Sequence, residues 1–250
     1  DTATPEIYTL SLPDALPIYQ LLSDLEPGLL APHIAPLLAR LEAIVCKDGH
    51  AFEEIASRIR LARIGRRRNN PAHFAVVSRA TLERRRIRVR HYHRATDQHS
   101  ERELSPQRLT FYRNNWYLEA WCHVRNDLRR FSVDALEDVD LLDAVADDVA
   151  KGRLDAVFGG SYGIYGGTPG HRALLRFSAA AARWVAEEEW HPDQIGRLEA
   201  DGRYALAVPY AEPTELMMDI LRHGQHVEVL EPAELRAAVA ESLRLAAGNY

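Results

Sequence analysis

Residues 87–133 read IRVRHYHRATDQHSERELSPQRLTFYRNNWYLEAWCHVRNDLRRFSV, and this stretch decides the fold of the middle of the chain. Apolar and polar side chains alternate along it in short runs, which are separated by turn-forming pairs such as Asn114-Asn115 and Asn126-Asp127. A period of two is typical of half-buried antiparallel strands. Because apolar spacing also predicts a helix at 73–85, the stretch favours a small, strongly bent antiparallel barrel after a helix. The predicted strands are 87–94, 101–105, 108–113, 116–125 and 128–133.

One face of two predicted strands, 87–94 and 116–125, combines cations with aromatic rings, while the other face is largely apolar. Guanidinium groups interleaved with aromatic planes are what a site for phosphates and stacked bases requires. The alternative is that this is only the solvated face of a small barrel. The residues on the cationic and aromatic face are Arg88, Arg90, Tyr92, Arg94, Tyr117, Trp121, His123 and Arg125.

Charge is segregated along the chain. Its 250 residues have a formal net charge of −5, from 31 basic and 36 acidic residues. Residues 58–130 hold 19 of the basic residues, all arginine, against 6 acidic ones, and the remainder holds 12 against 30. This asymmetry points to an anionic partner, and arginine suits bidentate contacts with phosphate. Arginine as an ordinary solvated surface residue is the alternative.

Arg129 differs from the other arginines because it shares the alternation of Phe131 and Val133. An arginine on an apolar face needs an anionic partner, since an unpaired buried charge is costly. That partner is either internal, for which Glu119 is the candidate, or a ligand.

The segments around the strands are less regular. Residues 1–18 have no helical or strand period and resemble the translation of a sequencing-library adapter, so we exclude them from the fold. Residues 19–72 carry apolar residues at helical spacing between prolines and predict short helices and a linker. The acidic residues 134–157 also show helical spacing, and the glycine-rich residues 159–170 predict a loop between domains.

The C-terminal part predicts a second domain. Helices are expected at 178–188, 212–223 and 232–247, and strands at 173–177, 194–200, 204–209 and 226–230. The order βαββαβ with a closing helix is the ferredoxin-like pattern. The fold class expected for the chain is therefore α+β.

Signals for catalysis, metal binding and membrane insertion are weak. Residues 159–163 match the G-x-S-x-G nucleophile elbow but lack its flanking strand and helix. His91 and His93 have no third metal ligand in sight, and the two cysteines cannot form a four-cysteine zinc site. No apolar run approaches the ~18 residues of a membrane span. We therefore expect no enzyme, metal, cofactor or membrane contact, and a cytoplasmic location; a hydrolase using Ser161 or a histidine is kept as an alternative.

Ordered motifs run through the strand region: SPQRL at 105–109, YRNNWYL at 112–118, AWCH at 120–123 and LRRF at 128–131, followed by Asp134. Together they closely resemble the WYL domain, whose name comes from the Trp-Tyr-Leu at 116–118. The C-terminal part resembles the extension that follows this domain in many bacterial regulators. That resemblance rests on YGI at 162–164, WV at 184–185, WHP at 190–192, DG at 201–202, EL at 215–216, GQHVEVL at 224–230 and Pro232.

The resemblance covers about 73–250, and more loosely 19–72. It implies an Sm-like, SH3-like barrel and membership of the YafY-type helix-turn-helix transcriptional regulators of bacteria. In that family the WYL domain is thought to sense an anionic, nucleic-acid-like ligand, an N-terminal winged helix binds operator DNA, and a homodimer is expected. Arg130 stands where the family usually has a small or hydroxylated residue. The positions that match the family's polar and aromatic pattern are Tyr92, Arg94, Arg102, Trp116, Tyr117, His123 and Arg129.

No winged helix is evident in residues 1–60, so we expect a truncated gene model that holds the sensing half of a regulator. The predicted function is to bind a nucleotide or single-stranded nucleic-acid-like ligand in a basic, aromatic groove of the barrel. Direct binding of single-stranded nucleic acid without a regulatory role is the alternative. The expected segments are 1–18 (non-native), 19–72 (helical remnant and linker), 73–136 (WYL domain), 137–170 (acidic helix and glycine-rich linker) and 171–250 (C-terminal extension domain).

Overall fold

The computed structural model describes residues 39–40, 67, 70–160 and 162–250. The predicted non-native segment 1–18, nearly all of the helical remnant 19–72, and Ser161 lie outside the described residues. The chain divides into two compact units, residues 1–148 and 149–250.

The described part of the first unit begins with helix α4 (Pro71–Glu83), which confirms the helix predicted there. The Asn70 side chain caps it by accepting a hydrogen bond from the Ala72 N–H at 3.0 Å. Pro71 stands in the first turn, where a missing N–H leaves no helical hydrogen bond unmade. The helix ends at Arg84, which adopts a left-handed conformation with φ 55°.

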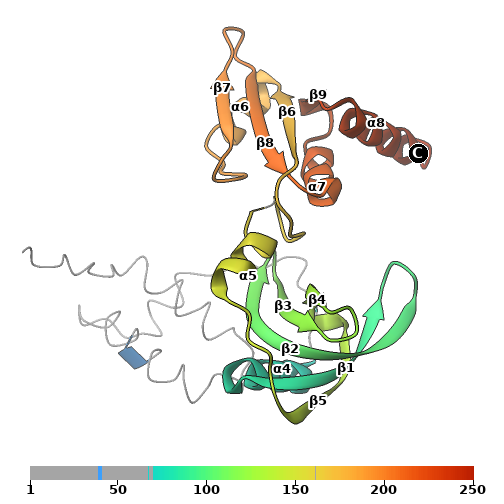
Figure 1. The fold of residues 1–250 in the computed structure, drawn as a ribbon. Coiled ribbons are helices and arrows are strands. Elements are labelled where there is room, and N and C mark those ends of the chain that lie inside the picture. The colour runs from blue at the N-terminus through green and yellow to red at the C-terminus, as the bar shows by residue number, and fades with distance from the viewer. Residues whose placement is uncertain (1–38, 41–66, 68–69, 161) are drawn as a thin grey trace, which may run out of the picture. The chain divides into compact units, whose positions relative to one another are not determined.

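Five strands follow and form one antiparallel sheet in the order β4-β3-β2-β1-β5. Figure 1 shows the sheet strongly curved, with α4 against it. β4 and β5 are its free edges and do not pair with each other, so the described residues form an open sheet and the expected closed barrel is wrong. The strands are β1 (Arg85–His93), β2 (Gln98–Tyr112), β3 (Asn115–Cys122), β4 (Asp127–Ser132) and β5 (Leu136–Val145), with a 3-10 turn at Val133–Ala135.

Two bulges explain where the predicted strands differ from the observed ones. The strands expected at 101–105 and 108–113 are the single strand β2, whose register shifts between Pro106 and Arg108. The helix expected in 134–157 is wrong for residues 136–145, which form strand β5. Helical structure in this region is limited to α5 (Lys151–Phe158). A register shift in the β1–β5 pairing and the left-handed Asp138, with φ 46°, interrupt the alternation that would have revealed β5.

The core of the first unit lies between α4 and one face of the sheet, which we call the interior face; the opposite one is the outer face. Helix α4 contributes Phe74, Val77 and Ala80, all nearly or fully buried. The 3-10 turn contributes Val133, and the sheet contributes Ile87, Val89, Leu104, Leu118, Ala120, Cys122, Phe131, Leu136 and Val139.

The second unit is also α+β, and its elements follow the predicted βαββαβ order with a closing helix. Its antiparallel sheet has the order β7-β8-β6-β9. The Ser178 side chain caps α6, as its sequence position predicts. The elements after α5 are β6 (His171–Phe177), α6 (Ala179–Val185), β7 (Ile195–Leu198), β8 (Tyr204–Tyr210), α7 (Pro213–His223), a 3-10 turn at Gly224–His226, β9 (Val227–Glu231) and α8 (Ala233–Ala247).

Part of the glycine-rich segment is fixed to α7. The Tyr162 hydroxyl donates to the buried Asp219 carboxylate at 2.6 Å, and the Ile164 N–H donates to the buried Glu215 carboxylate. This segment is therefore an integral part of the second unit. None of the described helices has the length and apolar character needed to cross a membrane.

Candidate functional site

The interior face of the first sheet changes from apolar to polar along its strands. Next to α4 it carries Ile87 and Val89, and toward the end of β1 the same alternation places His91 and then His93. Side chains opposite each other in a sheet project to the same face. Since Ser100 pairs with His91 and Arg102 pairs with Val89, two residues of β2 join this polar region.

The histidines contact each other and an aromatic ring. The ring nitrogens His91 Nδ1 and His93 Nε2 are 3.3 Å apart, and His93 Nε2 is 2.8 Å from Ser100 Oγ. The His91 ring meets Phe131 of β4 edge-on, with centroids 5.2 Å apart. Residues from β1, β2 and β4 therefore converge here. We call His91, His93, Arg94 and Arg102 the histidine–arginine cluster.

Positive charge is concentrated at this cluster. Burial has the largest effect on the pKa of His91, and together with charge repulsion from His93, Arg102 and Arg94 it lowers that pKa from 6.5 to about 4. His91 is therefore neutral at pH 7, in a position where an added proton is opposed by neighbouring cations. An anion placed there would be attracted for the same reason.

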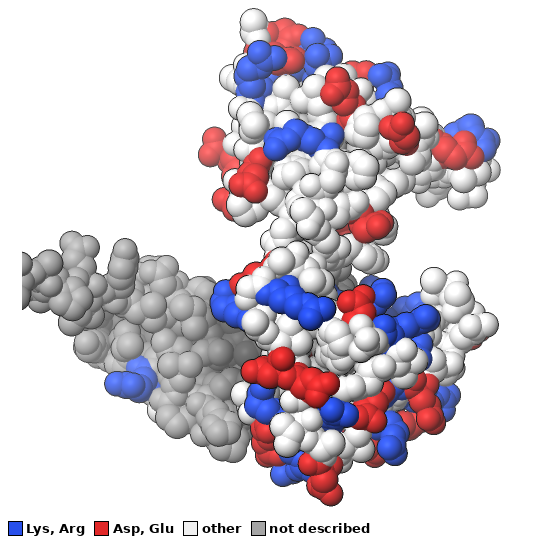
Figure 2. Space-filling model, viewed as in Figure 1, with Lys and Arg blue, Asp and Glu red and all other residues white. Residues whose placement is uncertain are grey.

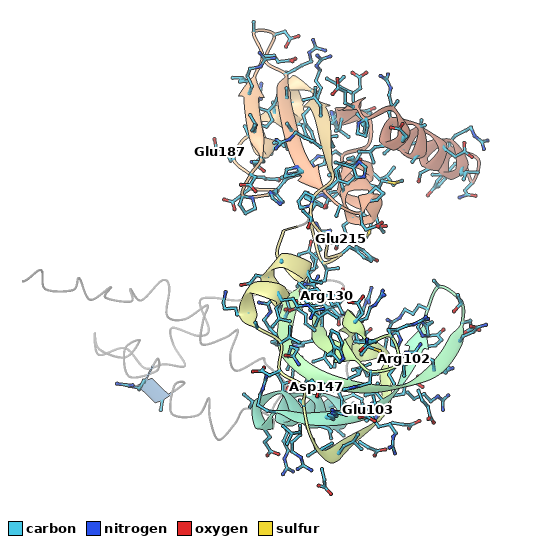
Figure 3. All side chains as sticks on the ribbon, in the orientation of Figure 1. Arg102, Glu103, Arg130, Asp147, Glu187 and Glu215 are labelled. Carbon is cyan, nitrogen blue, oxygen red and sulfur yellow. The ribbon has the colours of Figure 1, made fainter. Side chains whose placement is uncertain are left out.

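The two arginines of the cluster differ in their partners. Arg94 pairs with the Asp134 carboxylate at 2.7 Å. Arg102, half-buried and marked in Figure 3, donates to the Glu101 carbonyl at 3.1 Å and forms no ion pair among the described residues. Its guanidinium thus keeps donors available for a ligand.

The other predicted residues of β1 lie on the outer face. Arg90 is 3.6 Å from carboxylate oxygens of both Glu137 and Asp138. The Tyr92 hydroxyl donates to Asp97 at 2.8 Å, which raises its pKa. Arg88 is exposed and has no ion pair in the described part of the chain. Figure 2 shows basic and acidic side chains intermixed on the first unit, as these pairings require.

The predicted residues of β3 also divide between the faces. Trp116 belongs to the interior face, where its ring packs between Phe74 and Phe111 with centroid distances of 5.3 and 5.1 Å. It is therefore part of the core. Tyr117, Trp121 and His123 follow the opposite alternation onto the outer face, and Arg125 is exposed in the turn after β3. The structure thus distributes the predicted residues over two faces instead of one groove.

The register confirms that Arg129 shares the face of Phe131, because Arg129 lies opposite Ala120 and Phe131 lies opposite Leu118. The partner suggested for it is wrong, since Glu119 pairs with Arg130. Arg129 is 56% exposed and pairs with Asp127 at 3.3 Å. Arg130 is 11% exposed and donates to the Glu119 carboxylate at 2.6 Å. The β3–β4 turn occupies residues 123–126, earlier than the sequence indicated, and the resulting register places Glu119 opposite Arg130.

Glu119 forms the most buried ion cluster of the first unit. Its side chain is 1% exposed and also accepts hydrogen bonds from Arg108 at 2.7 Å and Thr110 at 3.1 Å. A carboxylate with this many donors is a structural charge and not a free acid or base. No group of three or more His, Cys, Asp or Glu side chains in the described ranges is arranged to hold a metal ion.

Sequence reasoning missed His91 and His93 as members of the site, although their alternation with Ile87 and Val89 was visible. The spacing of the two histidines indicates only a metal motif that lacks a third ligand. Arg102 came from the family resemblance alone, because the run 101–105 gives no reason to single it out.

Comparison with known proteins agrees with two domains in succession. Residues 72–141 match the WYL domain, and residues 169–247 match the WCX domain. A search of curated proteins found no significant match.

Solved structures with similarity to the chain include proteasome accessory factor B/C (PafBC) of Arthrobacter aurescens, at 23% identity and a TM-score of 0.34. They also include a CRISPR Cas-related protein, at 9% identity and a TM-score of 0.45. The matches cover 96% and 72% of this chain, but only 36% of PafBC and 52% of the second protein. The two domain matches show that the chain carries a WYL domain followed by a WCX domain.

Proposed function

We propose that this chain is the effector-sensing portion of a bacterial transcriptional regulator and that its WYL unit binds an anionic ligand at the histidine–arginine cluster. The observation that carries the proposal is Arg102, which lies on the interior face beside two histidines without a carboxylate partner among the described residues. A phosphate is the natural partner for such a guanidinium.

The surroundings of the cluster favour a nucleotide or a single-stranded nucleic acid over a simple anion. Phe131 is buried and supports the His91 ring from the core, and Arg129, which shares its alternation on β4, is exposed. On the outer face, Tyr92 stacks on His99 with centroids 4.9 Å apart. Each base stacked on such a ring contributes about 1–3 kcal/mol, and each phosphate contact adds a salt-dependent increment.

The test uses a fluorescently labelled single-stranded oligonucleotide titrated into the full chain. Arg102→Ala is expected to weaken binding about tenfold or more, the effect of a lost charge-assisted contact. Arg88→Ala is the matched control, because Arg88 is also an arginine without an ion pair but lies on the outer face. Equal losses in the two variants would contradict the proposed site. Unchanged affinity in Arg102→Ala would contradict it as well.

Finer features belong to the same proposal. Operator DNA would be bound by a winged helix outside this chain, the protein would act as a homodimer in the cytoplasm, and the alternative is a nucleic-acid-binding module without regulation. The strand order β7-β8-β6-β9 supports a ferredoxin-like second unit, and a helix followed by five strands supports an open, Sm-like first unit. Light scattering on the purified chain tests the dimer.

A further inference from the structure

Hydrogen bonds and an ion pair hold the last residues of the first unit to the WYL sheet. Residues 146–148, which we call the exit segment, follow β5 and end at the last residue of the first unit. The Ala146 N–H donates to the Arg84 carbonyl at 2.9 Å, and Asp148 forms an ion pair with the Arg84 side chain.

Asp147, at the centre of the exit segment, uses all of its polar groups. Its N–H donates to Ser105 Oγ at 2.9 Å, and its carbonyl accepts from Gln107 Nε2 at 2.7 Å. Its Oδ1 accepts from Arg86 at 2.8 Å, and its Oδ2 lies 3.9 Å from His123 Nδ1. Figure 3 marks Asp147 and Glu103 in this part of the first unit.

Ser105 and His123 orient one another toward Asp147. Ser105 Oγ is 2.9 Å from His123 Nε2. Because Ser105 accepts the Asp147 N–H, its own hydrogen is available for Nε2, which places the imidazole proton on Nδ1 facing the carboxylate. The order Ser–His–Asp resembles a hydrolytic triad, but Ser105 is fully buried, so no substrate can reach its hydroxyl. The hydrogen bonds of Ser105 hold Asp147 and His123 in place on the sheet.

Arg86 is shared between two carboxylates. It donates to Glu103 at 2.9 Å as well as to Asp147, and to the Val145 carbonyl at 3.0 Å. These two carboxylates raise its pKa, the hydrogen bond to Glu103 having the largest effect. If the Asp147 carboxylate moves away, Arg86 still has Glu103 as an acidic partner. One N–H group of Arg86 and the Nδ1–H of His123 would then point to the position that the carboxylate had occupied.

We propose that the Asp147 carboxylate is an internal counter-ion in an anion position between Arg86 and His123, and that a phosphate group displaces it and loosens the exit segment. The exchange is feasible because the Asp147 side chain is 51% exposed and returns to water without a large desolvation change. Phosphate offers more acceptor oxygens and more charge than the carboxylate it replaces. The inference rests on the proposed function, since it describes how an anionic ligand of the first unit would act on residues 146–148.

The test measures inorganic phosphate binding to the full chain at constant ionic strength, by NMR of the histidine ring protons. Asp147→Asn is expected to bind phosphate about two- to fivefold more tightly than the parent chain, the equivalent of one exposed ion pair. Asp148→Asn is the matched control, because Asp148 pairs with Arg84 and has no contact with Arg86 or His123 among its described interactions. Phosphate affinity unchanged by Asp147→Asn, or raised equally by Asp148→Asn, would overturn the inference.

Hydrogen exchange of the peptide that spans residues 146–148 tests the second half. Phosphate is expected to speed exchange of this peptide in the parent chain, while exchange of β2 and β3 stays constant and shows that the fold is intact. Exchange that stays constant at saturating phosphate would overturn the release. Arg102→Ala separates the two proposals: it is expected to weaken oligonucleotide binding about tenfold or more and to leave the phosphate effect on the exit segment in place.

Discussion

Arg129 and Arg130 are adjacent in β4, yet one is exposed beside Asp127 and the other is nearly buried against Glu119. Adjacent residues of a strand point to opposite faces, so the alternation placed Arg129 on the face of Phe131 and Arg130 on the other face. Which of the two contacts Glu119 depends on the pairing register of β3 and β4, which puts Glu119 opposite Arg130. The alternation therefore showed the face of Arg129, but it could not show which arginine pairs with Glu119.

Substitution of the two arginines makes this difference measurable. Arg130→Gln is expected to lower the free energy of unfolding by about 3 kcal/mol, because it removes a partner from a buried carboxylate. Arg129→Gln is expected to cost less than ~1 kcal/mol, as for an exposed ion pair. Urea denaturation of both variants checks the contrast, and costs of similar size would contradict the burial assigned to Glu119.

His91 gives the first unit a dependence on pH. Its pKa is about 4 in the folded chain, against a value of 6.5 without burial, so between these values the unfolded chain binds a proton that the folded chain does not. Stability is therefore expected to be retained above pH 6.5 and to fall as the pH drops toward 4. Urea denaturation at several pH values should show a weaker fall in His91→Phe than in the parent chain. Identical pH profiles would exclude His91 as the cause.

At the scale of elements, strands with bulges were harder to predict than regular helices and strands. The second unit was predicted almost element by element, because its helices α6 and α7 have their N-caps at Ser178 and Glu212, where helix starts are expected, and the register of β6, β7 and β8 is regular. The sequence of β5 predicts a helix because the bulge near Asp138 breaks the alternation and the apolar residues at 141, 142 and 145 fit a helical period. The spacing of residues within 136–145 gives no sign that this segment pairs with β1 as its second partner strand.

The glycine-rich segment offers a test at the same scale. Gly163 has φ 76°, and a Cβ there would collide with the Glu215 carboxylate that accepts the Ile164 N–H. Gly163→Ala is expected to destabilise the second unit by about 2 kcal/mol or more, the cost of a left-handed non-glycine residue plus the displaced carboxylate. Gly170→Ala is the control, since its Cβ would meet nothing within 4 Å and its φ is ordinary. Tryptophan fluorescence during urea denaturation follows both variants.

At the scale of the whole chain, the two units have separate cores without a shared residue. Phe177 is fully buried in the second core and Leu118 in the first. The glycine-rich loop and the order of elements after it indicated a second domain. The ion pairs around the site, however, link residues far apart in the chain, such as Arg94 and Asp134. Such pairs follow from topology and could not be read from the spacing of residues.

Independent cores predict independent responses to cavity formation. Phe177→Ala is expected to cost the second unit about 3–5 kcal/mol and to leave hydrogen exchange in β1–β5 unchanged. Leu118→Ala should show the reverse pattern, with faster exchange confined to the first unit. Loss of protection in both units from either variant would show that they unfold as one.

Arg90, Arg94 and Arg129 each have a carboxylate from their own chain within reach. A monovalent anion gains little by displacing any one of them, because it only substitutes one negative charge for another. A polymer of phosphates displaces several together, and each further contact forms at a high effective concentration once the first is made. Self-neutralisation of these three arginines thus makes their contribution to affinity depend on the number of linked phosphates, so that it rises steeply with ligand length.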